Sequence, residues 1–178
     1  MTSRATSIAG VVLAGITTAA VAGAASAPGS AREHAAPKRV TAAGVGQVKL
    51  GKTHSQLRAQ GLVGSIDAGC PLGGPGTRSA RLKSPLRGFV DYSTTSPRTV
   101  ESIAIRGGAR ARGIGVGATI PQIKAKFPNA KVFHGLEDLF DLTTVKIPKR
   151  DGGVFRFYVD VDTDRTVRIG VPFVPVCE

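Results

Sequence analysis

The chain has 178 residues, 42% of them hydrophobic and 5% aromatic, with two cysteines and no tryptophan. It carries 24 Lys and Arg against 12 Asp and Glu, a formal net charge of +12. This length is enough for one proper hydrophobic core. The charge excludes no partner by itself, because a basic surface favours solubility as readily as it attracts an anion.

The first 24 residues have the pattern of a secretory signal peptide. Arg4 precedes an uncharged run whose middle, residues 8–21, is apolar and is followed by small residues. This apolar run is shorter than the roughly 20 residues that span a bilayer, and small-x-small cleavage sites follow it. We expect cleavage after Ala24, with a retained anchor as the alternative. The mature chain is then secreted or extracellular, with no transmembrane segment and a net charge of +11, since residues 1–24 contain one basic residue and no acid.

Both cysteines belong to the mature chain, Cys70 early and Cys177 near its end. An exported chain with an even number of cysteines usually pairs them. The sequence therefore predicts a Cys70–Cys177 disulfide, with two free thiols as the alternative. The bond would close a loop of on the order of 100 residues, which the chain-entropy model values at about 4 to 5 kcal/mol.

Residues 25–44 follow the signal peptide. They contain scattered Pro, Gly and Ala with no apolar periodicity. This composition predicts a flexible N-terminal arm.

The rest of the chain is predicted to be a tandem repeat of one module, with copies over residues 45–108 and 109–178. The motif that begins at Gly51 returns at Gly117. A constant offset of 66 matches further pairs without a gap, among them Phe89 with Phe155, Tyr92 with Tyr158 and Ile103 with Ile169. A fixed period of this kind indicates a repeated structural unit.

Each copy begins with a short helix and continues in strands. Thr53 and Thr119 precede the helical segments, over 54–60 and up to Phe127, and can cap them. Alternating or β-branched runs predict three strands in each copy, over 79–83, 89–93 and 100–106 and over 142–147, 154–161 and 166–173. The predicted fold class is α+β, with two tandem helix-plus-antiparallel-strand modules in one curved sheet and both helices on one face.

One strand of the second copy shows which face of the sheet is buried. Its apolar residues alternate with polar ones, as Phe155, Phe157 and Val159 do with Arg156, Tyr158 and Asp160. One face is therefore expected to be buried and the other wet. Because the helices cover a single face, we expect the wet face to be open.

The start of each copy resembles a known family. It reads Gly-x-Thr-x-x-Gln, then an apolar residue and Lys or Arg, with the residues Gly51, Thr53, Gln56, Leu57 and Arg58 and again Gly117, Thr119, Gln122, Ile123 and Lys124. With the three-strand meander, this looks like the tandem modules of the β-lactamase inhibitory protein family, and each copy is similar to the module of SmpA/OmlA-type envelope lipoproteins. The resemblance covers nearly all of residues 45–174. It implies a fold and a habit of binding other proteins.

Two short patterns resemble ligand-binding loops but lack essential residues. Asp160, Asp162 and Asp164 are spaced like calcium ligands, yet Val171 stands where the closing Glu belongs, which favours a hairpin turn. The glycines of 113–117 lack the Lys-Ser/Thr of a phosphate-binding loop, which favours a tight entry to a helix. We predict no metal and no cofactor.

No catalytic residue is predicted. His54 occupies the first helical turn, where a half-buried position is expected, and His134 lies at a strand end or turn beside Glu137 and Asp138. No nucleophile motif accompanies them. A cleft that gathers His54 or His134 with a carboxylate would nevertheless indicate an enzyme.

The basic excess is the one chemical signal that points to a partner. Basic residues crowd segments 78–87 and 146–150. Such a surface attracts an acidic protein or an anionic envelope polymer, the alternative being a merely solvated surface, while export argues against nucleic acid. We expect a monomeric, non-catalytic binding module, with a secreted enzyme acting on cell-wall or extracellular substrates as the alternative. The predicted binding residues are those of the wet face: Arg81, Lys83, Tyr92, Arg156, Tyr158 and Arg168.

Overall fold

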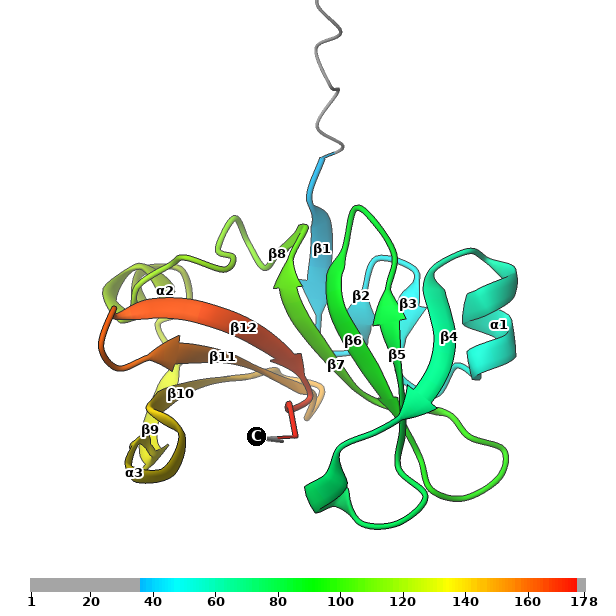
Figure 1. Ribbon diagram of the computed structural model, residues 1–178. Helices are drawn as coiled ribbons and strands as arrows, with labels where there is room; N and C mark the ends of the chain where they lie inside the picture. The colour runs from blue at the N-terminus through cyan, green and yellow to red at the C-terminus, as the bar shows by residue number, and fades with distance from the viewer. Residues whose placement is uncertain (1–35, 176–178) are drawn as a thin grey trace, which may run out of the picture. The chain divides into compact units, whose positions relative to one another are not determined.

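The computed structural model of the protein describes residues 36–175 (Figure 1). The predicted signal peptide, the first part of the predicted arm and Cys177 lie outside these residues. The strands are β1 (Lys38–Thr41), β2 (Gly44–Val45), β3 (Val48–Lys49), β4 (Val63–Ala68), β5 (Arg78–Leu82), β6 (Arg87–Tyr92), β7 (Val100–Gly107), β8 (Ala109–Arg110), β9 (Lys131–Leu136), β10 (Leu142–Pro148), β11 (Val154–Asp160) and β12 (Arg165–Val171). The helices are α1 (His54–Ala59), α2 (Ile120–Lys126), α3 (Glu137–Phe140) and the 3-10 turn η1 (Pro71–Gly73).

The fold is mostly β, with an antiparallel eight-stranded sheet and a mixed four-stranded sheet. The large sheet has the order β4-β5-β6-β7-β12-β11-β10-β9 and the small sheet the order β3-β2-β1-β8. The α+β prediction overestimates the helices. The two longer ones have six and seven residues, and each has one buried residue, Leu57 in α1 and Ile123 in α2. Gly61 and Pro128 follow them closely, so neither helix can extend further.

The repeated motif is a capping box at the start of each helix. The Thr53 hydroxyl accepts from the Gln56 amide at 3.3 Å, and the Gln56 side chain accepts from the Thr53 amide at 3.0 Å. The same two bonds join Thr119 and Gln122 at 3.5 and 3.0 Å. Both predicted N-caps are confirmed, and the motif recurs because it satisfies backbone donors that the first helical turn leaves unpaired.

The two halves of the large sheet have the same elements in the same order. One half is α1 followed by β4, β5, β6 and β7, and the other is α2 followed by β9, β10, β11 and β12. The prediction of three strands in each copy is therefore wrong by one, because it lacks β4 and β9. They meet where β7 pairs antiparallel with β12, with Ile103 opposite Val171, Ala104 opposite Gly170 and Ile105 opposite Ile169. Of these pairs only Ala104 and Gly170 correspond at an offset of 66, and the same offset exchanges the other two pairs, so the β7–β12 pairing is centred on Ala104 and Gly170.

The repeat is not free of gaps. In the β6–β7 pair Phe89 lies opposite Ala104, and in the β11–β12 pair Arg156 lies opposite Gly170. Since Ala104 corresponds to Gly170, β6 corresponds to β11 at an offset of 67. The predicted match of Phe89 with Phe155 and of Tyr92 with Tyr158 is therefore wrong. A shift of one residue places matched side chains on opposite faces of a sheet.

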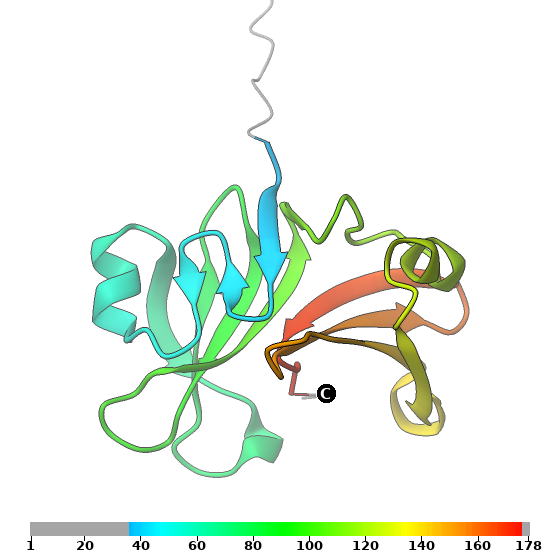
Figure 2. The ribbon, with the colours of Figure 1, turned by 180° about the vertical axis from the view of Figure 1, so that it is seen from behind.

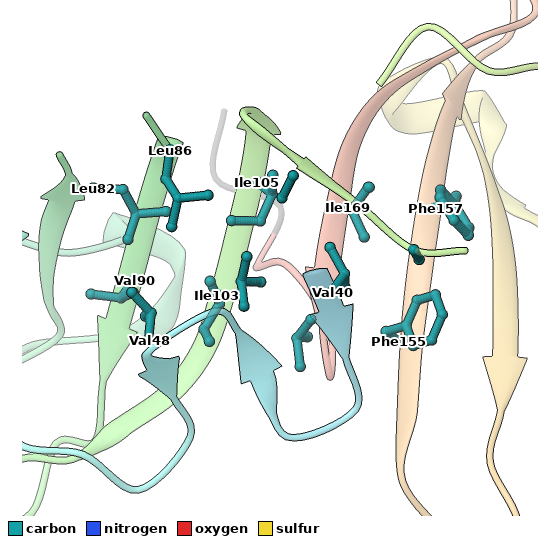
Figure 3. Packing of buried hydrophobic residues seen from close by; sticks show 14 of the residues in the cluster. Val40, Val48, Leu82, Leu86, Val90, Ile103, Ile105, Phe155, Phe157 and Ile169 are labelled. Carbon is teal, nitrogen blue, oxygen red and sulfur yellow. The ribbon is translucent and has the colours of Figure 1, made fainter. Parts of the chain in front are cut away.

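The main core lies between the large sheet, helices α1 and α2 and the small sheet. Inward residues of both halves pack together there, including Ile103, Ile105, Phe155, Phe157 and Ile169 (Figure 3). Strands β1, β2 and β3 lie over the helix side of β5–β7 (Figure 2) and contribute Val40, Val45 and Val48. The phenyl ring of Phe127 meets those of Phe155 and Phe157 at 5.7 and 6.0 Å.

Part of the predicted flexible arm, residues 25–44, is strand. Lys38–Thr41 pairs in parallel with β8 and antiparallel with β2. Val40 is 4% exposed within the main core. Gly44 allows the close turn, because a Cβ at this residue would lie 2.2 Å from the carbonyl oxygen of Val48. The strand at Lys38–Thr41 depends on pairing with β8, about 70 residues away in sequence. No local pattern in residues 25–44 could therefore predict it.

Candidate binding site on the outer sheet face

We use the term outer face for the side of the eight-stranded sheet opposite α1, α2 and the small sheet. The chain's own C-terminal segment, residues 172–175, covers the middle of this face. The Val174 amide donates to the Tyr158 hydroxyl at 2.9 Å, and Arg156 Nη1 donates to the Pro172 carbonyl at 2.6 Å. A Cβ on Gly170 would lie 2.7 Å from the Phe173 backbone. The sequence predicted an open outer face. This prediction is wrong for the middle of the face, which the C-terminal segment covers.

Both tyrosines that were predicted to be exposed are buried. Tyr158 is 3% exposed under the C-terminal segment, in a small cluster with Ala104, Leu142 and Val174. Tyr92 is 2% exposed and belongs to the main core, where its ring meets the His54 ring edge-on at 5.7 Å. Neither ring is presented to a partner.

Burial also sets the acidity of the two hydroxyls. It raises the pKa of Tyr92 from 10.0 to about 12. It raises the pKa of Tyr158 as well, and this is opposed by the hydrogen bond from Val174 and by the charges of Arg156 and Arg168. Both groups are neutral phenols at physiological pH.

The predicted residues of the second half do lie together. Arg168 is opposite Tyr158 in the β11–β12 register, and Arg156 is two residues from Tyr158 along β11. Both arginines are half-buried. Arg156 holds the C-terminal segment through Pro172 and Tyr158 holds it through Val174, so these two residues support the chain end.

In the first half, the outer face forms an open hollow of ≈ 370 Å³. Neighbouring strands contribute its lining, which consists of Asp67, Ala68, Ser79, Arg81, Gly88, Phe89 and Arg106. Arg81 lies opposite Phe89, and the Arg106 guanidinium carbon lies 5.9 Å from the centre of the Phe89 ring. Two exposed arginines thus flank a half-buried aromatic ring. This hollow, with Arg81, Phe89, Arg106 and Asp67, is the candidate site.

Lys83 does not belong to this hollow. It follows β5 as an exposed residue whose amide donates to the Leu62 carbonyl at 2.9 Å. It lines a different hollow, of ≈ 280 Å³, together with Lys38 and Pro85. Of the six predicted residues, only Arg81 lies in the candidate site.

The one-residue shift in β6 explains which residues the sequence reasoning missed. The offset of 66 matched Phe89 with the buried Phe155 and Tyr92 with a residue of the outer face. The strand pairing instead places Phe89 and Asp91 on the outer face and Tyr92 in the core. Arg106 was assigned to the end of the predicted strand over 100–106. A hydrophobic pattern that allowed a gap, aligning Val90 with Phe157, could have found Phe89.

Cys70 and the C-terminal segment line a smaller hollow on the protein surface. Cys70, Asp91, Phe173 and Pro175 line the same space of ≈ 230 Å³. Burial raises the pKa of Asp91, opposed by a hydrogen bond of 2.7 Å from Ser102. Cys177 lies outside the described residues, so the Cys70–Cys177 disulfide stays a prediction. Pro175, two residues before Cys177, lines the same hollow as Cys70.

The two histidines within residues 36–175 occupy different settings. His54 Nε2 lies 3.0 Å from the Gly64 carbonyl, as a half-buried helix residue. His134 Nδ1 lies 2.6 Å from Glu137 Oε1, and the Thr143 hydroxyl also donates to that carboxylate. These bonds lower the pKa of Glu137, with Thr143 contributing most. The His134 side chain is 68% exposed, and it lines none of the hollows described for residues 36–175.

The Asp160–Asp164 segment forms the hairpin turn between β11 and β12. Asp160 Oδ1 accepts from the Thr163 amide at 2.9 Å and from its hydroxyl at 2.6 Å. Across residues 36–175, no three His, Cys, Asp or Glu side chains gather closely enough to hold a metal ion.

Within the described part of the chain, no helix has the length and apolar character to cross a membrane. The chain matches no protein-family model, no curated protein and no solved structure.

Proposed function

We propose that the mature protein is a secreted, non-catalytic binding protein whose outer-face hollow receives acidic groups of a partner protein. The observation that carries this proposal is the placement of Arg81 and Arg106 on either side of Phe89. Arginine and aromatic side chains dominate the energetics of many protein interfaces. Asp67 is the one acid of the lining, which leaves the hollow with a positive charge.

The net charge of the mature chain supports an acidic partner. A charge of +11 raises the rate at which a negatively charged surface is encountered, and the hollow supplies the specific contacts. Interactions of exposed charges weaken strongly with salt, because screening acts over about 8 Å at physiological ionic strength.

We further propose that the two halves are tandem copies of one module, similar to those of the β-lactamase inhibitory protein family and of SmpA/OmlA-type lipoproteins. The two capping boxes and the centred β7–β12 pair support this proposal. In that family a turn of the first module offers an acid to the enzyme. Here the corresponding turn, residues 93–98, has Arg98 and no acid, so a different, acidic target is proposed.

The experiment uses the tagged mature chain as bait for the culture supernatant and for solubilised cell envelope, at about 0.1 M and about 1 M salt. The variant Arg81→Gln with Arg106→Gln removes both charges of the hollow. A matched variant, Arg58→Gln with Arg98→Gln, removes two arginine charges elsewhere. We expect one acidic protein to be retained at low salt by the wild type and the matched variant, and lost with the hollow variant.

Three outcomes would contradict this proposal. Equal loss in both variants would mean that only net charge matters. Retention unchanged in the hollow variant would place the contact elsewhere. Recovery of a phosphate-rich polymer and no protein would identify an envelope polymer as the partner.

The alternative function, a secreted hydrolytic enzyme, has one observation in its favour, the His134–Glu137–Thr143 chain of hydrogen bonds. A base oriented by a carboxylate is a common catalytic arrangement. If it were catalytic, His134→Ala would abolish turnover of cell-wall or peptide substrates by the mature protein. Absence of turnover in the wild type would remove this alternative.

A further inference from the structure

A further hollow lies on the helix side of the large sheet and holds a cluster of cations. It measures ≈ 650 Å³. Three separate segments line it: the loop after β8 with Arg112, the end of α2 with Phe127 and Asn129, and the β10–β11 turn with Pro148, Lys149, Arg150 and Asp151. We call it the basic hollow.

Hydrogen bonds fix the turn that forms one wall. The Lys149 amide donates to the Gly153 carbonyl at 2.9 Å, and the Gly152 amide donates to the Lys149 carbonyl at 3.2 Å. Asp151 Oδ1 accepts from the Gly153 amide at 3.0 Å. Asn129 Nδ2 donates to the Pro148 carbonyl at 3.1 Å, which joins the turn to the end of α2. The wall is thus preorganised.

Aromatic rings of the core draw the cations together. The Arg112 guanidinium carbon and Lys149 Nζ both lie 5.5 Å from the centre of the Phe127 ring. Lys149 Nζ also lies 5.0 Å from the centre of the Phe155 ring. Ring faces attract cations. Here two cations, Arg112 and Lys149, lie near the same ring and repel each other.

The local charge is unbalanced. Burial lowers the pKa of Lys149, and repulsion from Arg112 and Arg39 lowers it further, while Asp151 acts in the opposite direction. Among residues 36–175, none of Arg39, Arg112, Lys149 and Arg150 forms an ion pair with a carboxylate. A ligand of negative charge would offset this repulsion.

We propose that the basic hollow binds a phosphate group. Arg112 and Lys149 supply the guanidinium and ammonium donors that recognise phosphate oxygens, and Arg150 adds a third charge. Asp151 favours phosphate over sulfate or a carboxylate, because phosphate near neutral pH still carries an O–H that a carboxylate can accept. The volume exceeds that of one phosphate ion and leaves room for the molecule that bears it.

This site is independent of the proposed acidic partner protein. The candidate site uses outer-face residues of the first half, whereas the basic hollow opens beside Phe127, which belongs to the helix-side core. Variants of one site therefore leave the other intact.

The test is thermal unfolding of the mature chain in inorganic phosphate, in sulfate and in chloride at equal ionic strength. At about 100 times its dissociation constant, phosphate should raise the Tm by about 5 to 10 °C. Sulfate controls for the general stabilisation that such salts produce. No rise in phosphate beyond that in sulfate would overturn the proposal.

The variant Arg112→Gln with Lys149→Met removes both charges and keeps most of the side-chain length over Phe127. It should weaken phosphate binding by at least about tenfold. Arg58→Gln with Lys124→Met makes the same two changes on exposed helix positions and should bind phosphate like the wild type. An unchanged response to phosphate in the Arg112→Gln, Lys149→Met variant would overturn the proposal.

If the Arg112→Gln, Lys149→Met variant does not fold, the Arg39→Gln variant is tested in its place. Arg39 is an exposed residue of β1 that repels Lys149, so its loss should weaken phosphate binding by about threefold, measured by titration calorimetry. Unchanged affinity would contradict the proposal.

Two further probes separate the sources of the phosphate group. Glycerol phosphate represents a terminal phosphate, and diethyl phosphate represents the diester of a polymer backbone. Because the diester lacks an O–H for Asp151, we expect glycerol phosphate to bind more tightly. Preference for the diester would overturn the role of Asp151 and identify a polymer backbone as the ligand.

Discussion

The two halves of the large sheet share their element order, yet their outer faces differ. In the first half the face is hollow and presents Arg81, Phe89 and Arg106. In the second half the C-terminal segment lies over Tyr158 and is held by Arg156. The same element order therefore occurs twice, while residues 172–175 leave only the first half open. A repeat shows where a fold recurs, but it does not show that both copies present the same surface.

The largest expected effect comes from releasing the chain end. If the predicted Cys70–Cys177 disulfide is present, Cys70→Ser with Cys177→Ser should lower the free energy of unfolding by about 4 to 5 kcal/mol. It should also uncover Tyr158 and make the second half resemble the first. Urea denaturation measures the loss. Two alkylated thiols in the unreduced protein, detected by intact mass, would show that the bond is absent.

The next prediction uses the one-residue shift between the halves. Phe155 is 1% exposed in the main core, so Phe155→Ala should cost about 3 to 5 kcal/mol of stability. Phe89 is half-buried on the outer face, so Phe89→Ala should cost about 1 to 2 kcal/mol. Equal costs, measured by urea denaturation, would restore the gap-free alignment in which the two residues match.

The buried tyrosines predict an effect of alkaline pH. Tyr92 has its pKa raised from 10.0 to about 12, so the folded state holds a proton that the unfolded state loses in this range. The contribution of Tyr92 to stability should be constant below pH 10 and fall as pH rises through the window from about 10 to about 12, by at most about 1.4 kcal/mol per pH unit. Tyr92→Phe should flatten the fall in a series of urea denaturations. An equal slope in this variant would assign the effect to other groups, among them Tyr158.

The smallest predicted effect is the same in both halves. Thr53→Ala and Thr119→Ala each remove the side-chain half of a capping box and should each cost about 1 kcal/mol. Urea denaturation of the two variants compares them directly. Thr→Ser at either site retains the hydroxyl and serves as the control. A neutral Ala variant at one site would show that its capping box has no energetic weight.

Much of the local structure could be read from the sequence. The capping motif, the helix-stopping Gly61 and Pro128 and the alternation of Phe155, Phe157 and Val159 each act within a few residues, and the structure follows them. The candidate site was harder to predict. Its four main residues come from four strands, and the face that Phe89 occupies depends on a one-residue difference between the two loops that join the last two strands of each half.

The sequence by itself determined the repeat, both helix starts, three of the four strands of each half and the basic charge, because these follow from periodicity, capping chemistry and composition. Only the tertiary structure decided three further features. These are the ordering of Lys38–Thr41 against β8, the burial of Tyr158 under residues 172–175 and the gathering of Arg112 and Lys149 over Phe127. Each joins segments about 15 to 70 residues apart. Such contacts depend on where the folded chain places its loops and its end, and no local sequence pattern encodes this.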